Sequence, residues 1–238
     1  MEKPTVRSGI IGSGFAAAFH FNAIQRVYGV RSELLGVYSP NQTHAKAFAN
    51  NRKIKRWNDL DSLIDDADVV HICSPPATHE TIAISALQNG THVIVEKPMT
   101  GYFGDGSANF NGLDASKQLS LDMAVASIDR MRTAEKNSDA KLFYAENWVY
   151  SPAIQKEREI IKKTDAQILW MHGEEAHSGS HSAAYGDWSL AGGGSMIGKG
   201  CHPLTAALYL KRVEGYNRTG VPIQPKTVSA RIHNITQM

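Results

Sequence analysis

Cysteine, net charge and long apolar runs are all scarce in this sequence of 238 residues. The two cysteines, Cys73 and Cys201, are too few for a disulfide framework and suit a reducing compartment. A formal charge of +2 gives no basis for a nucleic-acid or membrane surface. No apolar run reaches the roughly 18 residues of a membrane span, and the N-terminus lacks a signal peptide's apolar stretch. These absences predict a cytoplasmic protein with no nucleic-acid or membrane partner.

What is present is an ordinary globular composition, with 42% hydrophobic and 20% charged residues. Short runs rich in β-branched residues are followed by helical patterns, and this alternation repeats along the first part of the chain. The runs span residues 6–11, 34–38, 69–73 and 93–95. The alternation predicts right-handed βαβ units and an α/β fold built on a parallel sheet.

A glycine-rich turn, Gly12-Ser-Gly-Phe-Ala-Ala17, joins the first of these runs to a helical stretch. This is a dinucleotide-binding fingerprint: Gly12 permits the tight turn, Gly14 lets the backbone approach a pyrophosphate, and Ala17 lets the helix lie close to the strand. The helix N-terminus offers free N–H groups and the positive end of its dipole to the anion. The predicted cofactor contacts in this turn are Gly12, Gly14, Phe15 and Ala16.

The end of the second strand bears on the choice between NAD and NADP. It reads Ser39-Pro-Asn41, without the acidic residue that holds the ribose 2′-hydroxyl in NAD-selective sites. The missing acid removes the repulsion that a 2′-phosphate would meet. We therefore expect an NAD(P) cofactor with a preference for NADP, although no arginine is adjacent in sequence, and we expect Ser39 and Asn41 to contact it.

The fourth strand ends in Glu96-Lys97-Pro98. Pro98 donates no backbone hydrogen bond and restricts the conformation of Lys97, so the strand should stop here. Because ligands of open α/β sheets gather at the carboxyl ends of strands, Lys97 is a candidate for chemistry. The alternative is a solvated lysine at a strand end.

These motifs together resemble the glucose–fructose oxidoreductase, inositol dehydrogenase and MocA (Gfo/Idh/MocA) family of NAD(P)-dependent oxidoreductases. The resemblance rests on the turn at 12–17, on Cys73-Ser-Pro-Pro-Ala-Thr-His79, on Glu96-Lys97-Pro98, on Glu146-Asn-Trp148 with Pro152, and on the Gly-rich stretch 192–202 that ends in a histidine. It implies a dehydrogenase or reductase acting on a CH–OH group of a sugar, cyclic polyol or related carbonyl compound. It also implies cofactor contacts from Ser74, Pro75, His79, Glu96 and Lys97.

The resemblance implies that Lys97 contacts the reacting oxygen, that His202 donates or accepts the proton, and that the Lys97–Pro98 bond is often cis. A cationic lysine stabilises a developing alkoxide, and a histidine titrates near working pH. The family commonly carries an aspartate four residues before the histidine, where this chain has Gly198. The alternative function is therefore a catalytically impaired cofactor-binding protein of the same fold, acting as a sensor, a partner subunit or a remnant.

The resemblance also implies that a polar loop around residues 177–188 lines the substrate site. His177 and His181 have a spacing that suits metal ligands on a helix, but Gly179 and the neighbouring serines disfavour a helix, and we expect no metal. Lys199 either binds an anionic group or is a local cation, and Trp188 is either a substrate contact or a core anchor. The predicted substrate-binding residues are His177, His181, Trp188 and Lys199.

Two domains are expected. Residues 1–145 should form a Rossmann domain with a doubly wound parallel sheet, in which a polar insertion at about 101–120 is a lid, an arm or a solvated loop. For residues 146–238 the resemblance implies an α+β substrate and oligomerisation domain with an open, mostly antiparallel sheet, incomplete at its C-terminus. Its strands, at 168–174 and 228–235, would expose an edge, which predicts a homo-oligomer through this sheet.

Overall fold

The computed structural model describes residues 3–107, 110–176, 179 and 182–232. The chain forms two compact units, one of Met1–Glu146 with Ala176–Lys199 and the other of Asn147–Glu175 with Gly200–Met238. The predictions that residues 146–238 bind the substrate and form an oligomer stay predictions.

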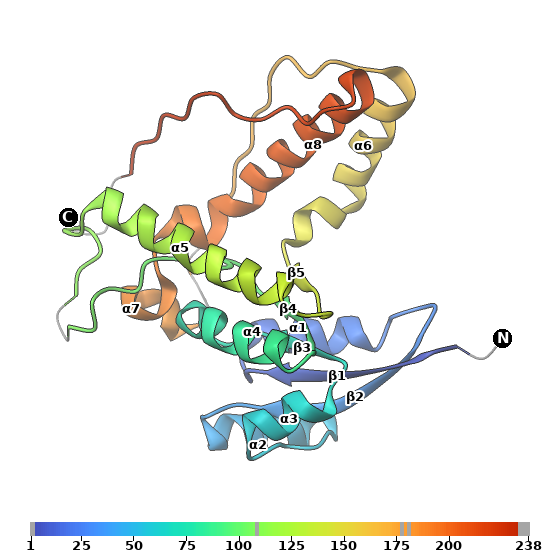
Figure 1. The fold of residues 1–238 in the computed structure, drawn as a ribbon, viewed down its shortest axis with the longest axis vertical. Helices are drawn as coiled ribbons and strands as arrows, with labels where there is room; N and C mark the ends of the chain where they lie inside the picture. The colour runs from blue at the N-terminus through green and yellow to red at the C-terminus, as the bar shows by residue number, and fades with distance from the viewer. Residues whose placement is uncertain (1–2, 108–109, 177–178, 180–181, 233–238) are drawn as a thin grey trace. The chain divides into compact units, whose positions relative to one another are not determined.

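The first unit is built on a five-stranded sheet with the order β2-β1-β3-β4-β5, in which every neighbouring pair is parallel. The strands are β1 (Thr5–Ile11), β2 (Arg31–Tyr38), β3 (Val69–Ile72), β4 (His92–Val95) and β5 (Leu142–Tyr144). Strand β1 lies between β2 and β3, so the winding of the chain reverses there (Figure 1). Such a reversal is the topological switch point where ligands of open α/β sheets bind.

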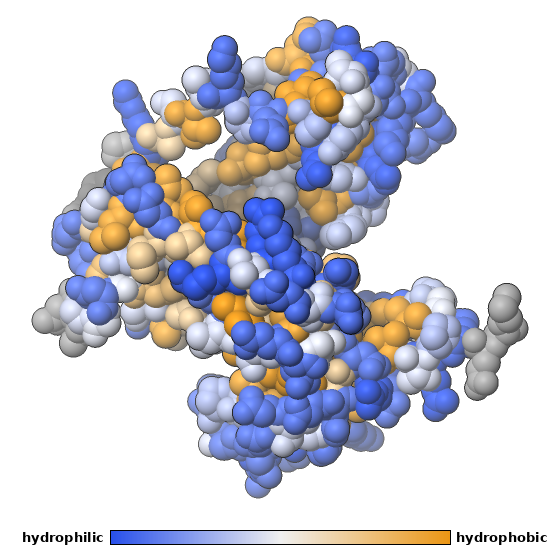
Figure 2. Space-filling view, in the orientation of Figure 1, coloured by the Kyte–Doolittle hydropathy of each residue, from blue (hydrophilic) through white to orange (hydrophobic). Residues whose placement is uncertain are grey.

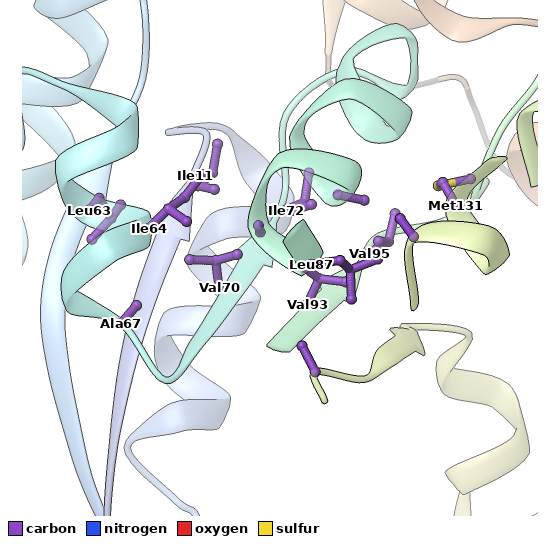
Figure 3. Close-up of a cluster of buried hydrophobic side chains, with 14 of the residues drawn as sticks. Ile11, Leu63, Ile64, Ala67, Val70, Ile72, Leu87, Val93, Val95 and Met131 are labelled. Carbon is purple, nitrogen blue, oxygen red and sulfur yellow. The ribbon is translucent and has the colours of Figure 1, made fainter. Parts of the chain in front are cut away.

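Helices cover both faces of this sheet. They are α1 (Phe15–Ile24), α2 (Gln42–Arg52), α3 (Leu60–Asp66), α4 (His79–Gln88) and α5 (Lys117–Lys136). Consecutive residues of β1 enter different cores, because Ile10 packs in the cluster with α1 and α2 and Ile11 in the one with α3, α4 and α5. In the second cluster, side chains of α3 and α4 pack around Val70, Ile72 and Val93 (Figure 3). The predicted Rossmann-like parallel sheet is confirmed.

Helix α5 takes up part of the expected insertion and exposes apolar side chains in its first half. It begins at Lys117, inside the expected insertion, because the Ser116 hydroxyl accepts a hydrogen bond from the Leu119 N–H (3.3 Å) and caps the first turn. Two apolar side chains in its first half, Leu121 and Val125, are 58% and 50% exposed. Hydrophobic surface accordingly lies over this part of α5 (Figure 2).

The second unit is built on two long helices, α6 (Pro152–Thr164) and α8 (Cys201–Thr219), which pack through Ile161, Leu210 and Val213. A π-helical turn, η4 (Met196–Gly200), runs directly into α8. The shorter elements of the chain are η1 (Pro76–Thr78), η2 (Asn147–Tyr150), η3 (Ala183–Gly186) and α7 (Trp188–Ala191). Within the described ranges, no helix has the length and apolar character needed to cross a bilayer.

The two strands expected in the second unit are absent from its described residues. Residues 168–174 form no strand, and neither do residues 228–232 of the expected strand 228–235. The backbone of Ile168 bonds instead to side chains of α8: its N–H donates to Glu214 (3.1 Å) and its carbonyl accepts from Lys211 (3.1 Å). Since a strand requires a ladder of backbone partners, these side-chain contacts satisfy the segment in a different way.

Candidate functional site

The glycine-rich turn lies at the switch point of the sheet. Gly12 has φ +106°, and a Cβ there would come within 2.7 Å of the Cys73 backbone, so only glycine fits between the ends of β1 and β3. A Cβ at Gly14 would meet no atom within 4 Å, and α1 begins without a side-chain cap. The open space and uncapped N–H groups fit a pyrophosphate. Phe15 and Ala16 are the first two residues of α1, and cofactor contact by these residues stays a prediction.

Ser39 and Asn41 follow β2 as expected, but Asn41 already has a structural task. Its side-chain oxygen accepts from the His44 N–H (3.0 Å) and caps α2. Ser39 is buried, and its carbonyl accepts from the Gln42 amide (3.2 Å). This turn is therefore held by its own hydrogen bonds, and cofactor contact by Ser39 and Asn41 stays a prediction.

His79 joins two of the predicted site segments and is itself inaccessible. Its side chain is 0% exposed, and its two ring nitrogens lie 3.0 Å from the carbonyl oxygens of Pro98 and Ser74. Burial lowers the pKa of this imidazole, which the two carbonyls partly offset. Ser74 also bonds the Thr78 hydroxyl (2.6 Å). The geometry favours a positioning role for His79, which ties the turn after β3, with Ser74 and Pro75, to the turn after β4.

A chain of hydrogen bonds that the sequence did not reveal supports Glu96. The Nδ1 atoms of His20 on α1 and His71 on β3 are 2.8 Å apart, and His20 Nε2 lies 3.1 Å from Glu96 Oε1. The other oxygen, Oε2, accepts from the Lys97 N–H (2.9 Å). Burial lowers the pKa of His71 to about 3, so this imidazole is neutral. Neither histidine lies in a local motif, so only the paired strands and helix bring them together.

Lys97 meets the Gly-rich stretch. The Lys97–Pro98 peptide is cis, as the resemblance implied. The ammonium donates to the Gly198 carbonyl (2.8 Å) and lies 5.6 Å from the centre of the Tyr185 ring. The Tyr185 hydroxyl in turn donates to the Lys97 carbonyl (3.3 Å). Two motifs about a hundred residues apart in sequence are thus joined at one side chain. Tyr185, which no sequence pattern singled out, contacts both the ammonium and the backbone carbonyl of Lys97.

Trp188 anchors the segment that follows Pro98. Its indole N–H donates to the Tyr102 carbonyl (3.1 Å), and a Cβ at Gly112 would lie only 2.0 Å from its ring. Tyr102 N–H also donates to the Gly192 carbonyl (3.1 Å). Tyr102 and Gly112 of this insertion are therefore held against residues 188–192. This geometry favours the anchor interpretation of Trp188.

Two further candidates, Lys199 and His202, lie just before α8 and in its first turn. His202 lies in the first turn of α8, is buried, and stacks on Trp148 with ring centres 5.7 Å apart and planes at 11°. Lys199 lies in η4 and is half-buried. His177 and His181 are outside the described residues, so the predictions that this loop binds substrate and holds no metal stay predictions.

Comparison with known proteins bears on the first half of the chain. Residues 6–120 match a family model described as "Oxidoreductase family, NAD-binding Rossmann fold". UDP-N-acetylglucosamine 3-dehydrogenase of Acidithiobacillus ferrooxidans is 34% identical over 95 residues, which are 40% of this chain and 29% of that protein. Glucose-6-phosphate 3-dehydrogenase of Bacillus subtilis is 37% identical over 91 residues, 38% of this chain and 25% of that enzyme. These relatives are dehydrogenases of sugar derivatives.

Solved structures share the fold over a longer stretch. GenD2 from gentamicin A biosynthesis, in complex with NAD, superposes with a TM-score of 0.66 over 88% of this chain and 54% of its own, at 20% identity. An NAD-binding oxidoreductase from Klebsiella pneumoniae gives a TM-score of 0.64 over 87% and 53%, at 22% identity. The chain thus spans about half of each solved structure and less than a third of the two curated relatives.

Proposed function

We propose a function from the fact that this chain belongs, through residues 6–120, to the Gfo/Idh/MocA family of NAD-binding oxidoreductases. The proposed reaction transfers a hydride between an NAD(P) nicotinamide and a CH–OH group. The proposed substrate is a sugar, cyclic polyol or related carbonyl compound. The observation that carries the proposal is the junction at Lys97, where a cation at the carboxyl end of β4 is held against Gly198 and Tyr185. It is supported by the sugar and inositol dehydrogenases among the relatives.

In this proposal, different residues bind the cofactor and stabilise the reacting oxygen. Gly12, Gly14 and the first turn of α1 hold the pyrophosphate of the cofactor. The cofactor, when bound, supplies or accepts the hydride. Lys97 stabilises the negative charge that develops on the substrate oxygen, and the Glu96 carboxylate and Tyr185 fix its position.

His202 is the proposed proton donor or acceptor. An imidazole can exchange a proton near neutral pH, which oxidation of an alcohol or reduction of a carbonyl requires. The stacked Trp148 ring fixes the plane of the imidazole. Residues His177, His181 and Lys199 remain the proposed substrate contacts, whereas Trp188 is proposed to anchor the neighbouring loop. A homo-oligomer formed through the second unit remains the proposed assembly.

One observation favours the second candidate function, a cofactor-binding protein without hydride-transfer chemistry. The hydrogen-bond partner of the Lys97 ammonium is a backbone carbonyl, that of Gly198, and a carbonyl holds a cation less strongly than a carboxylate would. Binding of the cofactor without turnover would support this candidate.

The test is to follow NADH and NADPH fluorescence against a panel of aldoses, sugar phosphates and inositols. We expect Lys97→Met to lower kcat/KM by ~10²-fold or more, because the alkoxide loses its cation. Lys136→Met, which removes an exposed lysine at the end of α5, is the matched control. Equal turnover in wild type and Lys97→Met would refute the catalytic assignment.

A further inference from the structure

An arginine lies beside the carboxyl end of β2, although it is distant from that strand end in sequence. Arg56 forms an isolated parallel bridge with Val37. On either side of it, the Val37 N–H donates to the Lys55 carbonyl (2.9 Å) and the Trp57 N–H donates to the Val37 carbonyl (2.8 Å). The backbone of residues 55–57 is thus fixed along the outer edge of β2, and the position of Arg56 is set by main-chain pairing.

The Arg56 side chain is connected to the turn that follows the strand. Its guanidinium donates to the side-chain oxygen of Gln42, the first residue of α2. The amide nitrogen of Gln42 donates to the Ser39 carbonyl (3.2 Å), one residue after β2. The glutamine amide therefore bridges the guanidinium and the turn. One N–H of the guanidinium is used in this bridge, and an arginine carries five.

The electrostatic surroundings favour an anion. Residues 39–42 read Ser-Pro-Asn-Gln, and the first turn of α2 holds no acidic residue. Within the described part of the chain, no ion pair joins Arg56 to a carboxylate. A guanidinium whose charge is not neutralised by the protein is suited to bind a phosphate through two parallel hydrogen bonds.

We propose that Arg56, positioned by Gln42, binds the 2′-phosphate of NADP and makes the protein selective for NADP over NAD. The inference rests on the proposed function, because it requires a dinucleotide bound at the Gly12 turn. In such folds the adenosine ribose lies at the end of the second strand, where a carboxylate selects the 2′-hydroxyl and an arginine accommodates the 2′-phosphate. This chain has the arginine without the carboxylate, but supplies it from the strand-pairing segment 55–57 and not from the turn itself.

The test measures dissociation constants of the whole chain for NADPH and NADH by fluorescence, and for 2′,5′-ADP and 5′-AMP by calorimetry. We expect NADPH and 2′,5′-ADP to bind at least tenfold more tightly than their counterparts. Arg56→Gln should weaken both phosphorylated ligands tenfold or more and leave NADH within twofold, because only the contact to the 2′-phosphate is lost. Arg31→Gln, which removes an exposed arginine at the opposite end of the same strand, should change none of the four constants.

Several outcomes would overturn the inference. Equal wild-type affinities for NADPH and NADH would show that the 2′-phosphate is not recognised. A loss of NADH and NADPH affinity by the same factor in Arg56→Gln would show that the arginine only supports the turn. Binding of neither dinucleotide by the wild type would refute the proposed function together with the inference, whereas the first two results would leave the proposed function standing.

Discussion

Single residues carry the proposed chemistry, and the most informative of them is Lys97. Its place at a strand end before a proline could be predicted from the sequence, as could the glycines of the dinucleotide turn, because each depends on a local backbone requirement. Its partner Tyr185 could not be predicted, since the contact depends on a loop that returns from nearly ninety positions away. The same reason hid His20, His71 and Arg56.

The contact between Lys97 and Tyr185 leads to a prediction at this scale. Tyr185→Leu removes the aromatic face from the ammonium and should lower kcat/KM about threefold relative to Tyr185→Phe, which keeps the ring. The readout is kcat and KM across pH, together with the affinity for NADPH, which should be equal in both variants. If the Phe and Leu variants have the same kcat/KM, the ring does not act on the lysine.

Helices and strands were predicted where the apolar pattern was strong and local. The first four strands of the sheet follow from β-branched runs buried on both faces. Helix α8 was not predicted, because it begins in a glycine-rich stretch. Its buried positions do recur at helical spacing, at His202, Ala206, Leu210 and Val213, and Gly220 ends it with φ +77°.

The packing of α1 against β3 predicts how stability depends on pH. His71 is neutral in the folded protein, with a pKa of about 3, whereas an unfolded histidine has a pKa of about 6.5. Below pH ~6.5 the unfolded chain binds a proton that the folded chain excludes, so the free energy of unfolding falls as the pH is lowered toward 3. His71→Asn should reduce this slope by about 1 kcal/mol per pH unit between about pH 5.5 and 4.5.

Urea unfolding at a series of pH values measures this slope. His44→Asn, which removes an exposed imidazole from α2, is the control and should follow the wild type. Parallel pH profiles for wild type and His71→Asn would contradict the prediction, because they would mean that His71 is protonated in the folded protein as readily as in the unfolded one.

At the scale of the whole molecule, the chain is two compact units with separate apolar clusters. The division near residue 146 follows the change from alternating strands and helices to a different pattern, whereas the expected antiparallel sheet depended on residues 168–174 and 228–235 finding strand partners. A pattern of β-branched residues states only that a segment can pair. A sheet in the second unit stays a prediction.

Separate clusters predict separate unfolding. Glu214 is 2% exposed and accepts hydrogen bonds from Lys211 (2.6 Å) and from the Ile168 N–H (3.1 Å). Burial raises the pKa of this carboxyl, but the two hydrogen bonds and the charge of Lys211 outweigh burial and lower the pKa below its usual value. Glu214→Ala should destabilise the second unit by about 1 kcal/mol or more, because the partly buried Lys211 ammonium and Ile168 N–H lose their acceptor. Part of the helical circular dichroism should then be lost at lower urea concentration, while NADPH remains bound.

Glu157→Ala, which removes an exposed carboxylate from α6, should leave both transitions unchanged. A single transition in Glu214→Ala, with NADPH released at the same urea concentration as the helical signal, would mean that the two units unfold together.

The short stretch 55–57 performs two tasks that are usually separate. Its backbone occupies hydrogen-bonding groups on the outer edge of β2, which makes that edge a poor template for a foreign strand. Its middle residue carries the charge that we assign to cofactor selection. Deleting one residue before it would move Trp57 into the place of Arg56 and turn the arginine side chain to the other face. Loss of NADP selectivity and a tendency to aggregate should therefore arise together from changes in the length of this loop, so its length should be under stronger selection than its exposed surface suggests.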